Sequence, residues 1–435
     1  MSYLNSEHDP IDRLLKTGHS LAGEIGEKAF LELELAYATR LLPRFSDDTI
    51  IRRNQNILLY WRRGYYKSTI LRVFSQTIPA EIKAVDISSM TLEKIFGSIN
   101  ERMKHIIQPA FTNDVKFVFV SELSSLLGQS DSMRQFVNLL NAVLESEKIS
   151  RQTLKLGMGE ISNDELLQLQ EKGVAYDSAK GELTYTPDVC FFAATRPLDN
   201  KYYTYLRESG HFSRYHVIQN NISDSVVKEH FKGSYKIDEE AFAQLKQINL
   251  LLSQVKVKKI LRPPESFMQP VYDNVIDIVE DELSGRNDLS TADVITPRTK
   301  GDIIRELVAH AFLRVAAQSN GTVIEDLKYT DDDLNFVLEN PYHFVEFALN
   351  PIIAPDLSRP QKNRKRETIK EAILDFLTDG TERQVDEIKL HVENKLAPLT
   401  VSQATVYTAL EELRSEGKIE RPRRAFYAFA KSQED

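Results

Sequence analysis

The sequence predicts an α/β protein built on a parallel sheet, followed by a helical region and a small C-terminal domain. The first observation is a set of short apolar runs separated by helical stretches, which is typical of buried parallel strands. These runs are Ile57 to Tyr60, Ile82 to Ile87, Phe117 to Val120 and Val189 to Ala194. The second is the helical spacing of apolar residues from Ile222 to Phe347. The third is a final stretch with three helical segments and two strands.

Composition limits the class of protein. The chain has 435 residues, of which 42% are hydrophobic, enough for two or three domains with their own cores. Its single cysteine, Cys190, excludes an internal disulfide, and no cluster of Cys and His suggests structural zinc. No apolar run approaches the ~18 residues needed to span a bilayer, so we expect a cytoplasmic protein. With a net charge of -9, any contact with DNA must come from local basic patches.

The order of these patterns divides the chain into parts. In residues 1–50 the apolar residues have helical spacing, which ends at Pro43. We expect an α/β core at residues 51–220, with a hairpin inserted at residues 151–187, and a helical lid at residues 221–349. Residues 350–366 combine three prolines with a basic run, which is typical of a linker, and residues 367–435 form the last domain.

A phosphate-binding loop is expected between the first strand and the helix after it, in the stretch WRRGYYKSTIL from Trp61 to Leu71. In such a loop backbone N–H groups hold phosphate oxygens, a lysine contacts the β- and γ-phosphates, and a hydroxyl binds Mg²⁺. Trp61 and Tyr66 replace the usual glycines, so the loop alone fits a surface turn equally well. The residues expected to bind ATP are Gly64, Tyr65, Tyr66, Lys67, Ser68 and Thr69, with Ser68 also on the metal.

An acidic residue follows the third apolar run. The run is followed by Ser121 and then Glu122. The spacing of Glu122 from Lys67 along the sequence suits the catalytic base of a hydrolytic ATPase, which orients or deprotonates water. Ser121 stands where an aspartate usually helps to hold Mg²⁺, so we expect weaker metal binding there. Taken alone, an acid at a strand end is also an ordinary strand terminus.

The remaining motifs resemble those of the AAA+ superfamily, in the branch with a hairpin before the sensor-1 strand. That branch includes MCM helicases, MoxR-type ATPases and bacterial enhancer-binding activators. The helix from Ser132 to Glu147 and the following KISR resemble its "LLxALExxxVxR" pattern. The hairpin is expected to pair Thr153 to Leu156 with Gly181 to Tyr185, with an acidic helical insert from Asn163 to Lys172. The strand CFFAATRP resembles "xxAATNP", which places Arg196 at the sensor position.

Two further arginines come from resemblance to MCM proteins. The segment GHFSRY resembles their "LLSRF" segment, which makes Arg214 the candidate arginine finger for the ATP of a neighbouring subunit. The helix that begins at ITPR resembles their lid helix, which places Arg298 at the sensor-2 position. The resemblance covers roughly residues 50 to 345 and implies a homo-oligomeric ring, a hexamer, with ATP between subunits. By itself, Arg214 also fits a surface arginine.

The last domain is expected to be a winged helix of three helices and a β-hairpin. Its helices span Glu367 to Leu377, Gln384 to Leu396 and Ser402 to Glu416, and its strands lie between Lys418 and Ala430. The third helix can enter a major groove, and the hairpin carries bases suited to phosphates. The candidate DNA-binding residues are Gln403, Thr405, Tyr407, Lys418, Arg421, Arg423 and Arg424. Because acidic and basic residues balance over 362–435, a domain that binds protein is the alternative.

Together these patterns predict an MCM-like ATPase that uses ATP and Mg²⁺ in a ring and translocates on, unwinds or remodels DNA. The catalytic candidates are Glu122, Arg196, Arg214 and Arg298, and the metal candidates are Ser68 and Ser121. The alternative is a nucleotide-binding scaffold with little or no hydrolysis, which recruits partners or binds DNA through its winged helix. The hairpin insert argues against contact with DNA in the channel of the ring, because it carries mostly acids, such as Glu160, Asp164, Glu165 and Glu171.

Overall fold

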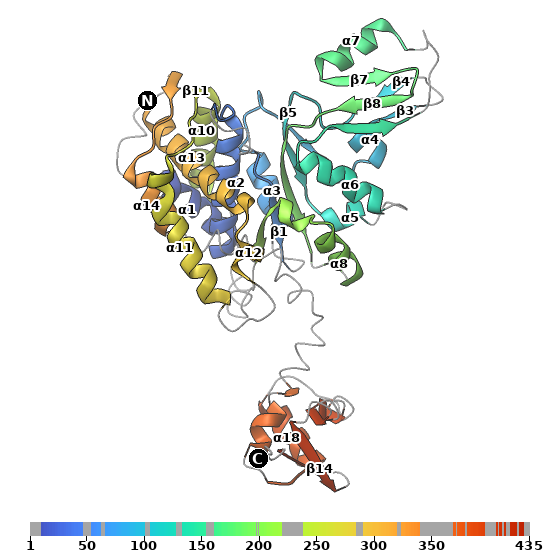
Figure 1. Ribbon diagram of the computed structural model, residues 1–435, viewed down its shortest axis with the longest axis vertical. Helices are drawn as coiled ribbons and strands as arrows, with labels where there is room; N and C mark the ends of the chain where they lie inside the picture. The colour runs from blue at the N-terminus through green and yellow to red at the C-terminus, as the bar shows by residue number, and fades with distance from the viewer. Residues whose placement is uncertain are drawn as a thin grey trace. The chain divides into compact units, whose positions relative to one another are not determined.

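The computed structural model divides the chain into two compact units, Met1–Ala354 and Pro355–Asp435, which are described separately (Figure 1). The residues that it describes are 10–46, 54–61, 66–100, 105–127, 133–153, 161–196, 198, 200–219, 238–283, 290–319, 323–339, 369–370, 372–378, 381–395, 406–407, 409–410, 413–414, 418–423 and 426–429.

A five-stranded parallel sheet forms the centre of the larger unit, in the order β10-β1-β9-β5-β2. The predicted α/β core is therefore confirmed, and β1, β2, β5 and β9 fall on the four predicted runs. Both faces of β1, β5 and β9 are buried, whereas β2 is largely exposed, contrary to the prediction of a buried strand there. The fifth strand, β10, was not predicted. The strands are β1 (Ile57–Tyr60), β2 (Lys83–Asp86), β5 (Val115–Val120), β9 (Cys190–Thr195) and β10 (His216–Gln219).

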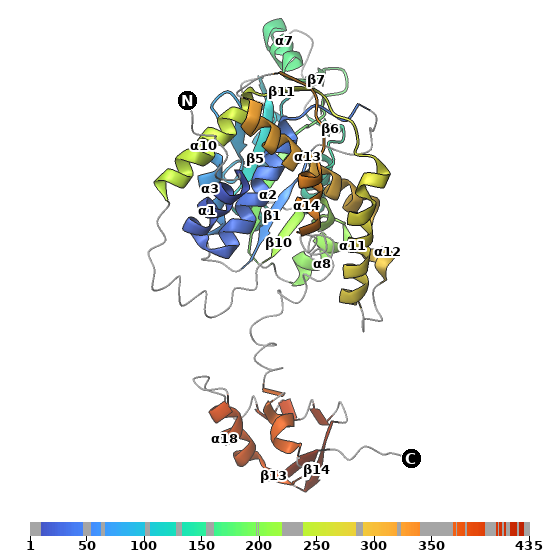
Figure 2. The ribbon, with the colours of Figure 1, turned by 90° about the vertical axis from the view of Figure 1, so that its left-hand side faces the viewer.

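Helices α2 (Glu24–Leu41) and α3 (Lys67–Ser75) cover one face of the sheet, and α1 (Pro10–Ala22) packs on α2. Helix α2 contacts β1, β9 and α3 on one side and α10 (Glu239–Gln254) and α13 (Pro297–Ser319) on the other. Figures 1 and 2 show it between the sheet and the lid. A helix enclosed in this way must be apolar nearly all round, and residues 29–31 (Ala-Phe-Leu) and 35–38 (Leu-Ala-Tyr-Ala) of α2 are indeed buried. The N-terminal helices therefore share one core with the sheet and the lid.

The lid is not purely helical, contrary to our expectation. Between its helices runs a two-stranded parallel pair, β11 with β12, whose exposed lysine-rich strand gives no apolar pattern that could predict it. The lid helices lie on one side of the sheet and the inserted hairpin on the other (Figure 1). Besides α10 and α13, the lid contains β11 (Lys256–Lys259), α11 (Glu265–Leu283), α12 (Thr291–Val294), β12 (Val323–Asp326) and α14 (Asp331–Glu339).

The inserted hairpin has three antiparallel strands, in the order β6-β8-β7, where two were expected. Its first strand is β6 (Ile149–Gln152), which lies earlier than the predicted Thr153 to Leu156; Thr153 follows the strand, and the rest of that segment lies outside the described residues. The other elements are α7 (Asn163–Glu171), β7 (Val174–Asp177) and β8 (Glu182–Tyr185).

A second small hairpin, absent from our predictions, lies beside the insert. It pairs β3 (Ser98–Asn100) with β4 (His105–Ile107), and the backbone N–H of Ile106 donates to Glu165 Oε1 of α7 at 2.8 Å. The insert is thus attached to the body by its acidic helix. The remaining elements of this unit are α4 (Leu92–Phe96), α5 (Leu123–Leu127), α6 (Met133–Leu144), α8 (Asn200–Glu208) and η1 (Phe212–Arg214).

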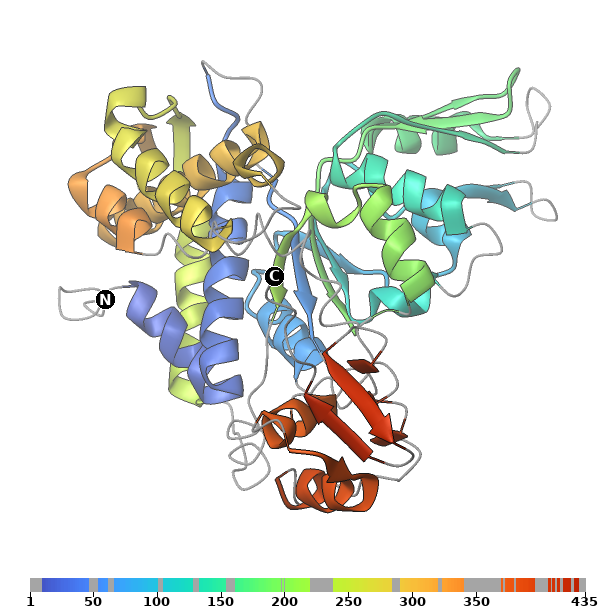
Figure 3. The same cartoon turned by 60° about the horizontal axis from the view of Figure 1, so that its bottom comes forward.

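The smaller unit has its own apolar core and a three-stranded sheet in the order β13-β15-β14 (Figure 3). Its described elements are β13 (Arg383–Gln384), α18 (Val385–Lys395), β14 (Ile419–Arg423) and β15 (Phe426–Phe429). The core joins them to the buried side chains of Ile369, Ile373, Leu377, Val406, Leu410 and Leu413. Over the described part of the whole chain, no helix combines the length and the apolar character required to cross a membrane.

Candidate nucleotide site

Lys67 opens α3 just beyond the carboxyl end of β1. Its Nζ donates to the carbonyl oxygen of Trp61 at 2.7 Å and lies 5.7 Å from the centre of the Trp61 ring. Burial lowers the pKa of Lys67 to about 8, while the nearby carboxylate of Glu122 acts in the opposite direction. A lysine held by a loop carbonyl at the start of a helix is ready to exchange that carbonyl for a phosphate oxygen.

Tyr66 is the N-cap of α3 and has left-handed backbone angles, φ 55° and ψ 2°. This conformation costs a residue with a side chain roughly 1 kcal/mol, which explains why phosphate-binding loops usually place glycine there. The tyrosine is strained at the position where the sequence departs from the usual pattern. Gly64 and Tyr65 lie outside the described residues, and Thr69 lines a cavity of about 430 Å³ next to α3.

Glu122 follows β5 and faces the end of β9. Its Oε1 accepts from the hydroxyl of Ser124 at 2.6 Å, from the Arg196 backbone N–H at 3.3 Å and from the Thr195 hydroxyl at 3.4 Å. These contacts fix the predicted base at the carboxyl edge of the sheet, near Lys67. The side chain of Arg196 is exposed at the same edge.

The two predicted metal residues also meet at this edge. The hydroxyl of Ser68 donates to the Ser121 carbonyl oxygen at 3.0 Å. The Ser121 hydroxyl lies 3.2 Å from Ser88 Oγ, which donates in turn to Asp86 at 2.5 Å. Asp86, at the end of β2, was missed by sequence reasoning because its strand is exposed and carries no motif. Oxygen donors suit Mg²⁺, which needs few protein ligands when it also binds phosphates, so a hydroxyl and nearby carboxylates fit this metal.

The other two predicted catalytic residues lie at the opposite edge. Arg214 precedes β10, whose first residue pairs with Ile57 at the start of β1. Lys67, by contrast, lies beyond the end of β1, so the four residues of that strand, about 13 Å in length, separate the two edges. Arg214 is held there by Asn56, whose amide donates to the Arg214 carbonyl oxygen at 3.1 Å. It cannot reach a nucleotide on its own Lys67.

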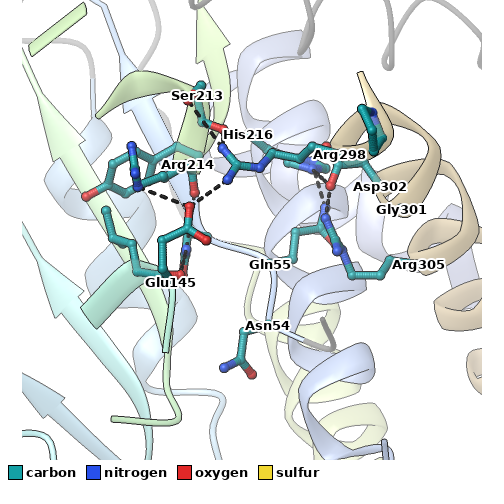
Figure 4. A pocket seen from close by; sticks show the side chains of 14 residues that line it. Asn54, Gln55, Glu145, Ser213, Arg214, His216, Arg298, Gly301, Asp302 and Arg305 are labelled. Atoms are coloured by element: carbon teal, nitrogen blue, oxygen red, sulfur yellow. Dashed lines mark hydrogen bonds and ion pairs between the residues drawn. The ribbon is translucent and has the colours of Figure 1, made fainter. Parts of the chain in front are cut away.

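Arg298, at the start of α13, joins Arg214 at this amino edge (Figure 4). One guanidinium nitrogen donates to the backbone carbonyl oxygen of Ser213, and the other donates to Glu145 Oε1 at 2.5 Å. Arg214 Nε forms an ion pair with the same oxygen of Glu145 at 3.0 Å. The three side chains line a cavity of about 220 Å³. Glu145 was not singled out as a site residue from the sequence, although the pattern that its helix resembles has a glutamate at this point.

A buried polar cluster lies behind this cavity. Glu32, His216 and Glu306 place one ligand atom each within 4.8 Å of one another, which is compatible with a metal by distance. Both ring nitrogens of the imidazole, however, have polar neighbours outside this trio. Nδ1 lies 2.8 Å from the Gln55 amide nitrogen, and Nε2 lies 3.1 Å from Asp302 Oδ1. The cluster is therefore a polar contact between α2, β10 and α13.

Burial explains the state of that cluster. Desolvation raises the pKa of Glu306 well above its usual range, and the charge of Glu32 acts in the same direction. Desolvation lowers the pKa of His216, so the imidazole is neutral. This cluster, which joins the start of β10 to α13, therefore buries few charged groups.

The candidate DNA-binding residues lie in the smaller unit. Tyr407 has an exposed fraction of 39%, and Lys418 and Arg421 are exposed, with the Arg421 guanidinium 5.6 Å from the centre of the Tyr427 ring. Gln403, Thr405 and Arg424 lie outside the described residues, as does the side chain of Arg423.

Comparison with known families agrees with the geometry of the larger unit. Residues 57–213 match the family described as ATPase family associated with various cellular activities (AAA). The match runs from β1 to the residue before Arg214, and so includes Lys67, Ser121, Glu122 and Arg196. Residues 57–213 are therefore similar to an AAA ATPase domain, which supports nucleotide binding by this part of the chain. No protein with a curated description is significantly similar to the sequence.

Proposed function

We propose that the chain is an ATPase whose active sites form between neighbouring copies in a ring. The observation that carries this proposal is the separation of the site into two halves. Lys67 and Glu122 lie at the carboxyl edge of the sheet, whereas Arg214 and Arg298 meet at the amino edge. A second copy must bring its amino edge to the carboxyl edge of the first, and repeated head-to-tail contacts of this kind close into a ring.

Each half has a distinct role in this scheme. Lys67 binds the β- and γ-phosphates, Ser68 offers a hydroxyl to Mg²⁺, and Glu122 orients the attacking water. Arg196 faces the γ-phosphate from the end of β9 as a sensor. Arg214 and Arg298 arrive from the neighbour and stabilise the charge that develops on the transferred phosphoryl group. Mg²⁺ neutralises phosphate charge when bound.

Mixing two inactive variants tests the shared site. Lys67→Ala removes phosphate binding but keeps the arginines, and Arg214→Ala does the reverse, so each alone should lose most ATPase activity. In a mixture, a Lys67→Ala copy can supply arginines to the nucleotide of an Arg214→Ala copy, and activity should return in part. A mixture that stays as inactive as its components would overturn the shared site.

We further propose that the ring acts on DNA, as the resemblance to MCM proteins implies, and that the smaller unit is a winged helix that contacts phosphates. The support is its exposed Tyr407, Lys418 and Arg421 on a three-stranded and helical unit. Replacing Lys418 and Arg421 by Ala in the full chain should weaken filter binding of duplex DNA about equally for all sequences and lessen its salt dependence. Unchanged binding would favour a domain that binds protein instead.

The second candidate function is a scaffold that binds nucleotide with little turnover. It is favoured by Tyr66 with its left-handed backbone and by Ser121 in place of an aspartate. Both features affect phosphate and metal binding, and so the hydrolysis of ATP, more than the fold. Measuring ATP binding and hydrolysis on the same sample separates the two candidates: binding without Glu122-dependent hydrolysis supports the scaffold, whereas hydrolysis that Glu122→Gln abolishes supports the ATPase.

A further inference from the structure

Glu145 lies between two arginines that come from different parts of the chain. A single oxygen, Oε1, is 3.0 Å from Arg214 Nε and 2.5 Å from a terminal nitrogen of Arg298 (Figure 4). Glu145 directly follows the last residue of α6, where a carboxylate meets the negative end of the helix dipole. The helix gains nothing from an acid at this point, so the charge serves the two guanidinium groups.

The exposure of the three side chains gives their order from inside to outside. The Glu145 side chain is 9% exposed, that of Arg214 24% and that of Arg298 42%. The carboxylate therefore lies beneath the guanidinium groups, which are more open to solvent. An anion that approaches this edge meets the arginines first. Glu145 thus supports the pair from behind and does not occupy the place of an incoming phosphate.

Resting on the shared site proposed above, we infer that Glu145 is a positioning residue that holds Arg214 and Arg298 side by side for the phosphate of a neighbouring subunit. Two guanidinium groups at such close range repel each other, and a shared carboxylate offsets the repulsion. The same contact links α13 of the lid to the end of α6, and so fixes the lid arginine against the sheet.

The two arginines depend on Glu145 to different degrees. Arg214 has further contacts, because one of its terminal nitrogens donates to the carbonyl oxygens of Gly210 at 2.5 Å and Ser209 at 3.3 Å. Within the described residues, the side chain of Arg298 has hydrogen bonds only to Ser213 besides Glu145. Loss of the carboxylate should therefore misplace Arg298 more than Arg214, and Glu145→Gln should resemble Arg298→Ala.

The complementing mixture provides the test, because it separates the copy that donates arginines from the copy that binds ATP. Glu145→Gln keeps the size of the side chain and removes its charge. Added to the Lys67→Ala donor, it should lower the restored ATPase rate by about 10- to 100-fold, the usual cost of a misplaced catalytic group. Added to the Arg214→Ala copy, it should leave the rate and the affinity for ATP unchanged.

Two controls and one comparison complete the experiment. Glu147→Gln changes a nearby exposed carboxylate and should have no effect in the donor, and Glu145→Asp should recover part of the rate. In the donor, Glu145→Gln should add nothing to the loss caused by Arg298→Ala. Equal loss in donor and acceptor, or no loss in the donor, would overturn the role of Glu145 while leaving the shared site intact. If the parent mixture itself fails to restore activity, both the shared site and this role are wrong.

Discussion

Lys67 is the residue whose environment most directly constrains the nucleotide site. It is buried and bonded to the Trp61 carbonyl oxygen, and burial lowers its pKa to about 8. A bound phosphate brings negative charge next to the ammonium group, which favours the protonated form. Binding of ATP and protonation of Lys67 are therefore linked.

This linkage predicts a pH dependence of ATP affinity. In the free protein Lys67 loses its proton as the pH rises through about 8, whereas in the complex its pKa is higher, so binding takes up a proton and weakens above that pH. Between pH 8 and 9.5 the affinity should fall by up to about tenfold per pH unit. Calorimetry in buffers of different ionisation enthalpy measures the proton uptake. Binding with no uptake and a flat profile would contradict the prediction.

Tyr66 gives a second prediction at the same scale. Tyr66→Gly relieves a left-handed backbone that is strained without nucleotide as well, so it should raise the free energy of unfolding by about 1 kcal/mol. It also removes a bulky side chain from the loop, which should strengthen ATP binding. Tyr66→Ala removes the bulk but keeps the strain of a Cβ atom, and serves as the matched control. If both variants bind alike, the size of the side chain, and not the backbone, sets the affinity.

At the scale of elements, helix α2 contacts both the sheet and the lid, and Glu34 is one of its fully buried polar residues. The carboxyl group is fully buried, and the amide nitrogen of Asn249, from α10, is best oriented toward it, at 3.0 and 2.6 Å from its two oxygens. In that orientation the Asn249 oxygen accepts from the Thr77 hydroxyl, just after α3, at 2.8 Å. Burial raises the pKa of Glu34 to about 8.

The raised pKa of Glu34 predicts how stability changes with pH. Above its ordinary pKa of 4.5 the unfolded chain loses this proton, while the folded protein keeps it up to about pH 8. The folded state thus binds more protons, and its stability from this group falls as the pH rises between these values. The stability of Glu34→Gln relative to the parent should increase by about 1.4 kcal/mol per pH unit over that window and then level off.

Thermal unfolding of the parent and Glu34→Gln at pH 5, 6.5 and 8 measures this difference. The glutamine keeps the size and the hydrogen-bonding capacity of a protonated glutamate, so the two proteins should unfold at similar temperatures at pH 5. A difference in unfolding temperature that stays constant from pH 5 to 8 would show that Glu34 is ionised in the folded protein.

Predictability also differs among elements. Strands β1, β5 and β9 could be predicted because they are buried on both faces and are therefore apolar without interruption. Strand β10 begins at His216, which is buried through polar contacts with Gln55 and Asp302, so its sequence lacks that signal. Strand β11 is mostly lysine and exposed. These two strands carry too few apolar residues in sequence to be detected by spacing alone, whereas the exposed β2 was found because apolar residues flank it.

At the scale of the whole molecule, two units with separate cores predict separate unfolding. The larger unit contains the entire nucleotide site, whereas the smaller unit is closed by its own cluster around Ile373, Ile388 and Leu410. Scanning calorimetry of the full chain should show two transitions. Because a ligand stabilises only the unit that binds it, saturating ATP with Mg²⁺ should raise one transition by several degrees and leave the other in place.

The variant Lys67→Ala is the control for that experiment, since it should remove the shift without changing the second transition. A single cooperative transition, or a shift of both transitions with ATP, would contradict the independence of the two units.

The sequence by itself determined the α/β core and the residues at its carboxyl edge. Those residues follow their strands directly along the chain, so strand order brings Lys67, Ser121, Glu122 and Arg196 together once the sheet is parallel. Only the tertiary structure decided that Arg298 of the lid meets Arg214 over Glu145, at the edge away from Lys67. That arrangement depends on the packing of α13 against α2 and β10, contacts between residues far apart in sequence that no local pattern records.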